Sequence, residues 1–269
     1  TTVGALGDVD ITSVNANIAA SKSMTVDATS LDDDALTADF SAETSAGASV
    51  TILTDGTGAH IITLGAGADT YTGTSTGVDT VVATAGANII STGAGADIIT
   101  VGTGVDTVNA GLGDDVIIAA SANLASTDTL DGEGGTDTLQ FSGDTTVTDA
   151  MMLALANVEA ISGTASQELG ITLGPNADTA GIVAVNFVGV GAGDSDSLTL
   201  PATYTNNITV DIDSDAASAN TIAAAAYTGV LTVTASDEDL QAAQTITGGT
   251  GTSDELQVTL TAGTDTITT

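Results

Sequence analysis

The hydrophobic residues of this chain recur with a nine-residue period between residues 56 and 118. Seven times, a glycine-containing turn ends in a residue that is Asp in five cases, and the residue two places further on is apolar. We call the polar positions the slot residues: His60, Asp69, Asp79, Asn88, Asp97, Asp106 and Asp115. The apolar positions are Ile62, Tyr71, Val81, Ile90, Ile99, Val108 and Ile117. Every step between slots is nine residues except one of ten, which we assign to an insertion near Gly73 and Thr74.

This register predicts a parallel β-solenoid. Each unit has the pattern of a tight glycine turn followed by a short strand with a side chain pointing inward. Such a strand buries its apolar side only by stacking on its neighbours, and two units make one coil of about eighteen residues. Slots 79, 97 and 115 then share one edge of the solenoid, and slots 69, 88 and 106 share the other.

The rest of the chain also predicts β-structure. Apolar alternation indicates strands at residues 182–188, 208–212 and 230–234, separated by Gly, Asn and Asp turns at intervals of roughly 20 residues. Residues 149–160 form either a short helix or an irregular crossing, and residues 236–244 favour one helical turn. We therefore expect an all-β chain in three parts. A β segment over 1–50 precedes a β-roll or β-helix solenoid over 51–140, and a β-rich segment over 141–269, solenoid or sandwich-like, follows.

Composition excludes several classes of protein. Asp and Glu number 35 against a single Lys and no Arg, which gives a net charge of −34. Without a basic patch we expect no nucleic-acid partner, and without an apolar run of about 20 residues no membrane insertion. Hydrophobic residues make up 42% of the chain, which argues against disorder. We expect no enzyme, because there is no Cys and no Ser-His-Asp pattern around the only His.

The stacked slot residues predict a cation. Carboxylates repeated at a strand spacing of about 4.8 Å repel one another unless a positive charge lies between them. Calcium takes six to eight oxygen ligands at roughly 2.3–2.6 Å, from carboxylates and backbone carbonyls alike, whereas magnesium demands a tighter octahedron. Zinc would be poorly served without Cys. The alternative is that Asp and Gly merely favour tight corners. We predict multiple Ca2+ ions.

The predicted ligands are the polar residues of these turns and of similar turns further along the chain. They are Asp69, Asp79, Asn88, Asp97, Asp106, Asp114, Asp115, Asp128, Asp131, Asp137, Asp194, Asp196, Asp254 and Asp265. The turn glycines that would direct carbonyls toward the ions are Gly67, Gly77, Gly86, Gly95, Gly104 and Gly113.

The repeated Gly-x-Gly-x-Asp-x-apolar motif resembles the RTX nonapeptide repeat of secreted Gram-negative proteins, a calcium-binding β-helix repeat. The first Gly of the family's pair is mostly replaced here, and His60 and Asn88 stand in Asp positions, so sites that use these two should be weaker or absent. The resemblance implies calcium binding, type I secretion and an extracellular location.

A narrower resemblance involves residues 128–139 (DTLDGEGGTDTL) and 155–161 (LANVEAI). This pair is similar to stretches of the calcium-dependent surface-layer (S-layer) proteins of Gram-negative bacteria. It implies that the chain assembles with copies of itself into a lattice on the cell surface, attached to cell-surface polysaccharide through regions outside these residues. The alternatives are an extender segment of a large secreted adhesin, or the carrier domain of a type I-secreted enzyme or toxin. We expect the chain to be a piece of a longer protein.

Overall fold

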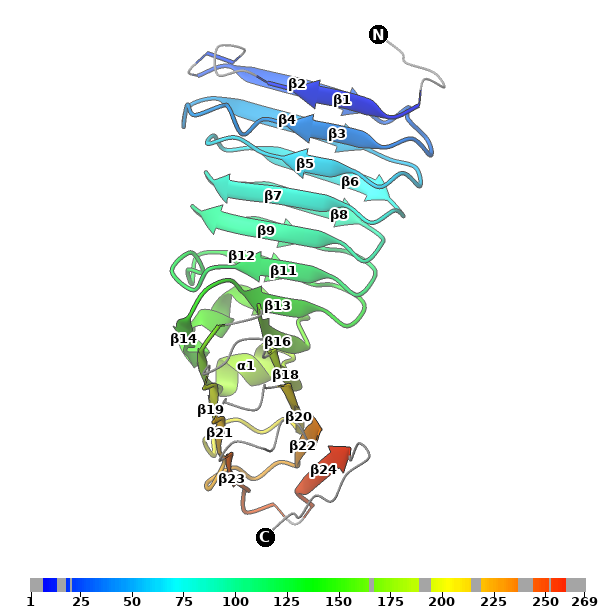
Figure 1. Ribbon diagram of the computed structural model, residues 1–269. Helices are drawn as coiled ribbons and strands as arrows, with labels where there is room; N and C mark the ends of the chain where they lie inside the picture. The colour runs from blue at the N-terminus through cyan, green and yellow to red at the C-terminus, as the bar shows by residue number, and fades with distance from the viewer. Residues whose placement is uncertain are drawn as a thin grey trace. The chain divides into compact units, whose positions relative to one another are not determined.

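The computed structural model describes residues 7–13, 18–19, 21–164, 167–188, 195–213, 219–236, 244–251 and 253–259. It is an all-β parallel solenoid, as the sequence predicts (Figure 1). The chain divides into two compact units. The first comprises residues 1–139 and 154–158, so residues 1–50 lie in the same unit as most of the repeat block, and the second comprises 140–153 and 159–269.

Two parallel sheets build the first unit, and successive strands alternate between them (Figure 1). In order, one sheet contains β1 (Val9–Thr12), β3 (Leu36–Asp39), β5 (Ile61–Thr63), β7 (Thr80–Ala85), β9 (Ile98–Thr103), β11 (Val116–Ala119) and the start of β13 (Thr138–Phe141). The other contains β2 (Ser23–Ala28), β4 (Ser49–Thr54), β6 (Thr70–Ser75), β8 (Ile89–Gly93), β10 (Thr107–Asn109), β12 (Thr129–Asp131) and β15 (Leu155–Ala156). Two strands and two turns therefore complete one coil.

The apolar residue two places after each slot forms the core between the sheets. Val81 pairs with Ile99 and Ile99 with Ile117, while in the other sheet Tyr71 pairs with Ile90. All seven of these side chains are at most 1% exposed. Since burying one such side chain contributes about 1.5–3 kcal/mol, these in-register ladders stabilise the stacking of the coils.

The ten-residue step appears as a β-bulge. In the pairing of β6 with β8, the register shifts between Thr72 and Ser75, the place where the sequence indicates an inserted residue. The strands on either side keep their register because the bulge absorbs the extra residue.

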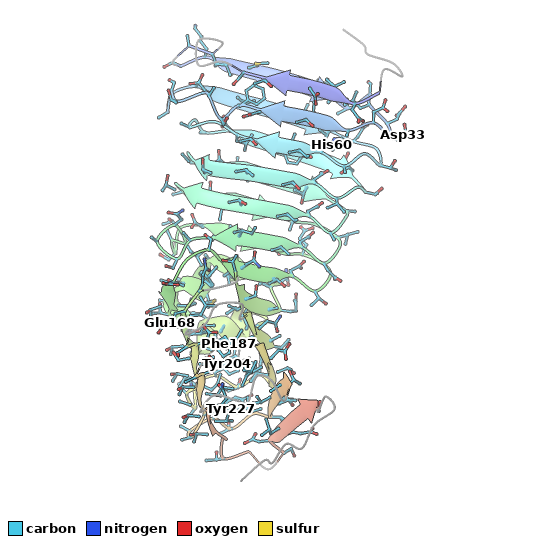
Figure 2. All side chains as sticks on the ribbon, in the orientation of Figure 1. Asp33, His60, Glu168, Phe187, Tyr204 and Tyr227 are labelled. Carbon is cyan, nitrogen blue, oxygen red and sulfur yellow. The ribbon has the colours of Figure 1, made fainter. Side chains whose placement is uncertain are left out.

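The second unit also contains two parallel sheets. One includes β16 (Ala160–Gly163), β18 (Ala184–Val188), β20 (Ile208–Asp213), β22 (Leu231–Ser236) and β24 (Glu255–Thr259). The other includes β14 (Thr145–Val147), β17 (Leu169–Thr172), β19 (Ser197–Thr199), β21 (Thr221–Ala223) and β23 (Thr245–Thr247). Strands β18, β20 and β22 confirm the three strands expected here. In its core the rings of Tyr204 and Tyr227 stack with centroids 5.8 Å apart (Figure 2).

In the described part of the chain, two short helices interrupt the strands. Residues 149–160 contain the 3-10 helix η1 (Asp149–Ala154), which leads directly into β15, so only the first half of this segment is helical. Helix α1 (Pro175–Ala180) was not predicted, although it has Pro at its start and ends at Gly181 with φ 100°. Most of the turn expected at 236–244 lies outside the described residues. Within the described ranges, no helix is long and apolar enough to cross a membrane.

Candidate metal centre

The slot residues of one edge form a hydrogen-bonded column, which we call the first column. Each carboxylate accepts a hydrogen bond from the backbone N–H of the slot residue one coil earlier. Oδ1 of Asp79 lies 2.9 Å from the nitrogen of His60, and Oδ1 of Asp97 lies 2.7 Å from that of Asp79. Asp115 accepts from Asp97 at 2.7 Å, and Asp137 accepts from Asp115 at 2.8 Å. Slots 79, 97 and 115 thus share an edge, as predicted.

The second column runs along the other edge by the same contacts. Asp69 accepts from the N–H of Val50 at 2.7 Å, and Asn88 accepts from that of Asp69 at 3.1 Å. Asp106 accepts from Asn88 at 3.0 Å, and Asp128 accepts from Asp106 at 3.0 Å. Residues 128 and 137 come 22 residues after their partners, so the columns continue although the coil has lengthened.

Burial makes these carboxylates electrostatically costly. The side chains of Asp69, Asp79, Asp97, Asp106 and Asp115 are at most 2% exposed. Burial raises the pKa of each, and it raises the pKa of Asp115 to about 7, to which the neighbouring acidic charges contribute. The single Lys of the chain is exposed. Because a buried carboxylate stays ionised only beside a compensating charge, the columns need either protons or a cation.

Two slot carboxylates have an oxygen left over for a ligand. Oδ2 of Asp97 and Oδ2 of Asp115 are buried and have no hydrogen-bond partner among the described residues. The hydroxyl of Thr92 lies near Asp97, but its hydrogen goes to the carbonyl of Ala110 at 2.6 Å. Such orphaned buried oxygens are expected where a metal ion binds.

Backbone carbonyls line the same edges. A Cβ on Gly113 would lie 1.8 Å from the carbonyl oxygen of Gly95, and one on Gly95 would lie 2.3 Å from that of Gly77. On the other edge, Gly104 approaches the carbonyl of Gly86 in the same way, at 1.8 Å. Gly95, Gly104 and Gly113 also have positive φ, so glycine is required there both for conformation and for space. Successive turns therefore stack backbone against backbone beside the carboxylates.

The column carboxylates and turn carbonyls together fit calcium better than they fit a metal that is bound by side chains alone. Among the residues that the structure describes, no group of three His, Asp or Glu side chains lies close enough to hold a metal ion. A cation at these edges would be held by one or two carboxylates together with turn carbonyls. Such all-oxygen coordination suits Ca2+.

Asn88 fills its slot differently. Its Oδ1 accepts the amide bond of the column, while its Nδ2 donates to the turn carbonyls of Ala85 at 3.0 Å and Gly86 at 3.3 Å. The amide thus binds oxygens that a cation would otherwise bind, which supports the expectation of a weaker site. His60, at the other replaced slot, accepts from the N–H of Leu36 through Nδ1 at 3.1 Å (Figure 2).

Asp79 has hydrogen bonds on both oxygens, which the sequence does not indicate. Its Oδ2 accepts from the Tyr71 hydroxyl at 2.7 Å and from the Ser75 hydroxyl at 3.0 Å. The Tyr71 hydroxyl also lies 2.8 Å from that of Thr54. The bulge between Thr72 and Ser75 lies in this cluster. Two protein hydroxyls thus donate to Oδ2 of Asp79, whereas Oδ2 of Asp97 has no such donor among the described residues.

Asp114 and Asp131 lie outside the two columns. Asp114 Oδ1 accepts from the N–H of Thr136 at 2.8 Å, at an exposed position beside Asp115. Asp131, which is half-buried, accepts through Oδ1 from the N–H of Glu133 at 3.0 Å and from Nδ2 of Asn157 at 2.7 Å. The structure gives both carboxylates protein partners.

A similar column occurs in the second unit. Asp196 accepts from the N–H of Leu169 at 2.7 Å, its own N–H donates to Asn220 at 2.9 Å, and that of Asn220 donates to Gln244 at 2.7 Å. Asn220 and Gln244 are not among the predicted ligands, because their only signal in the sequence is a 24-residue spacing.

The other ligands predicted in this part of the chain were Asp194, Asp254 and Asp265. Asp254 accepts from the N–H of Leu231 at 3.1 Å and from that of Gly249 at 2.8 Å. Asp194 and Asp265 lie outside the described residues.

Comparison with known families gives one match. The family model of the RTX calcium-binding nonapeptide repeat matches residues 74–108, 100–123 and 124–144. The matched ranges include the slots from Asp79 to Asp115 and also Asp128 and Asp137, which the structure places in the columns. No curated protein and no solved structure matched the chain.

Proposed function

We propose that this chain, an RTX-repeat calcium-binding protein and a structural segment of a secreted protein, forms part of a self-assembling surface layer whose folding and assembly depend on Ca2+. Its role is structural, without catalysis, and its partner is a second copy of itself at the cell surface.

The two columns of buried carboxylates carry the calcium part of this proposal. With a net charge of −34, the chain repels itself and stays expanded where calcium is scarce, as in the cytoplasm. Outside the cell, millimolar calcium neutralises the columns, and the free energy of ion binding becomes free energy of folding. The chain is thereby exported unfolded and folds after export.

The surface-layer part rests on residues 128–139 and 155–161. These stretches resemble S-layer proteins, and they contain Asp128, Asp137 and the strands β12 and β15 that extend the repeat block. A stretch that both continues the calcium columns and resembles lattice-forming proteins supports coupling of calcium binding to assembly.

Sedimentation velocity across a calcium titration tests the proposal. The titration runs from chelator to about 10 mM calcium, which is enough to saturate even weakly binding extracellular calcium modules. We expect large assemblies that dissolve again in chelator, and no such change with magnesium. A chain that becomes compact as calcium is added but stays monomeric at every calcium concentration would support calcium-coupled folding and contradict self-assembly. That result would favour an adhesin extender or a carrier domain. An unchanged sedimentation coefficient throughout would contradict calcium binding itself.

A further inference from the structure

We propose that Glu43, which lies outside the repeats, is a ligand of one further calcium ion, shared with Asp69 at the N-terminal end of the second column. The inference rests on the calcium binding proposed above and adds a site that the repeat motif does not contain.

The turn that contains Glu43 stacks directly on the first turn of the second column. Residues 40–48 connect β3 to β4, and residues 64–69 connect β5 to β6 one coil later. The N–H of Ala66 donates to the carbonyl of Glu43 at 2.9 Å. A Cβ on Gly67 would lie 1.9 Å from the carbonyl oxygen of Ala48, which repeats the close approach seen between the later turns.

The slot position of this earlier coil has no side-chain oxygen. Val50 donates its N–H to Asp69, so it occupies the place in the column that an Asp occupies elsewhere. Its apolar side chain is 1% exposed. At this level the column therefore lacks one carboxylate, and Glu43 from the same turn can supply it.

Glu43 is buried with one oxygen unused. Its side chain is 2% exposed, and Oε1 accepts from the N–H of Ser45 at 2.6 Å. Oε2 is buried and has no hydrogen-bond partner among the described residues. A buried acidic side chain that satisfies only one oxygen needs a proton or a cation at the other.

Glu43 and Asp69 both contact the same glycine, Gly65. A Cβ on Gly65 would lie 2.9 Å from Cβ and 3.2 Å from Cγ of Glu43, so the Glu43 side chain packs against this glycine. The N–H of Gly65 donates to Oδ2 of Asp69 at 3.1 Å. The only lysine, Lys22, is exposed.

Two buried carboxylates beside turn carbonyls form a hard-oxygen donor set. Calcium combines carboxylates with backbone carbonyls in flexible geometry, whereas magnesium retains several waters. The ion at this end of the column would neutralise Glu43 and Asp69 together and join residues 40–48 to the repeat block. If Glu43 instead keeps its proton and is neutral, the substitution Glu43→Gln should not change calcium binding.

Counting bound ions tests this site. Equilibrium dialysis with calcium chloride should show that Glu43→Gln binds one ion fewer than the wild type at saturation. Glu168→Gln, the same change at an exposed glutamate (Figure 2), should bind the wild-type number. An unchanged number and affinity in Glu43→Gln would overturn the inference while leaving the proposed function intact. No bound calcium in the wild type would overturn both.

A second measurement avoids any folding defect in the variant. The chain has six glutamates, so their carboxyl 13C resonances can be followed separately in the wild-type protein. We expect the Glu43 resonance at saturating calcium to be that of an ionised carboxylate, like that of the exposed Glu168. A protonated Glu43 at saturating calcium would overturn the inference.

Discussion

At the scale of single residues, what surrounds the second carboxylate oxygen distinguishes the slots. Asp97 and Asp115 keep a buried Oδ2 that has no hydrogen-bond partner in the described part of the chain, whereas Oδ2 of Asp79 accepts from Tyr71 and Ser75. In the sequence all three are the last residue of a similar turn. Their spacing therefore predicts their common column, while the hydroxyl cluster around Asp79 arises from contacts that the spacing does not encode.

We predict that Asp97→Asn weakens calcium binding more than Asp79→Asn. Both variants keep an oxygen to accept the column's amide, but only Asp97→Asn removes charge from an oxygen that is free for a ligand. The calcium concentration at the folding midpoint should rise by about tenfold or more for Asp97→Asn, equivalent to about 1.4 kcal/mol, and by less for Asp79→Asn. Circular dichroism during a calcium titration measures it, and equal shifts would contradict the assignment.

The slot occupied by Asn88 allows the opposite experiment. Asn88→Asp removes the Nδ2 donor to the carbonyls of Ala85 and Gly86 and adds a charge next to Asp106. We therefore expect lower thermal stability in chelator and an increased number or affinity of bound ions in calcium. Thermal melts measure the stability in chelator, and isothermal titration calorimetry measures the number and affinity of the bound ions. Weaker calcium binding in this variant would contradict an ion site at this turn.

At the scale of elements, the stacked glycine turns decide how closely the coils approach. Gly104 has a φ of 137°, and a Cβ there would lie 1.8 Å from the carbonyl oxygen of Gly86. Gly143 has a φ of 103° but no atom within 4 Å of the same position. The two glycines thus share a left-handed backbone and differ in the space around it.

Gly104→Ala should accordingly be far more destabilising than Gly143→Ala. We expect about 1–3 kcal/mol from backbone strain alone at Gly143, and a clearly larger loss at Gly104, where the stacked turns must also separate. Denaturant unfolding in saturating calcium measures both free energies. Similar losses in the two variants would show that strain, not close stacking, is what matters.

Predictability at this scale follows from how regularly an element repeats. The strands of the repeat block and the bulge near residue 73 could be located because each break in period is visible against seven regular units. Helix α1 has only six residues, and its N-terminal amides at Asn176 and Ala177 are bonded to Asp149 from 27 and 28 residues earlier. Contacts of that range leave no local pattern.

At the scale of the whole molecule, the excess of acid makes stability depend on protons as well as calcium. The folded-state pKa of Asp115 is about 7, against an ordinary value of 3.8. Between these two pKa values the folded chain binds more protons than the unfolded chain. The free energy of unfolding of the metal-free chain is therefore greatest below the ordinary pKa, and this contribution is lost as pH rises through 7. Raised pKa values of Asp69, Asp97 and Asp106 act in the same direction.

We therefore predict that the melting temperature in chelator falls as pH rises from 5 to 8, until little folded chain remains at pH 8 and low salt. In saturating calcium it should rise over the same interval, because protons compete with the ion for the carboxylates. Differential scanning calorimetry at a fixed ionic strength gives both curves. Parallel curves with and without calcium would show that the buried carboxylates are not the calcium ligands.

The central claim is that calcium neutralises the buried columns and thereby folds the chain. Far-UV circular dichroism at low salt and pH 8, begun in chelator and continued by adding calcium, tests it most directly. We predict little β-structure in chelator and a cooperative gain of β-structure as calcium is added, reversed by more chelator. Full β-structure in chelator, unchanged by calcium, would contradict the claim.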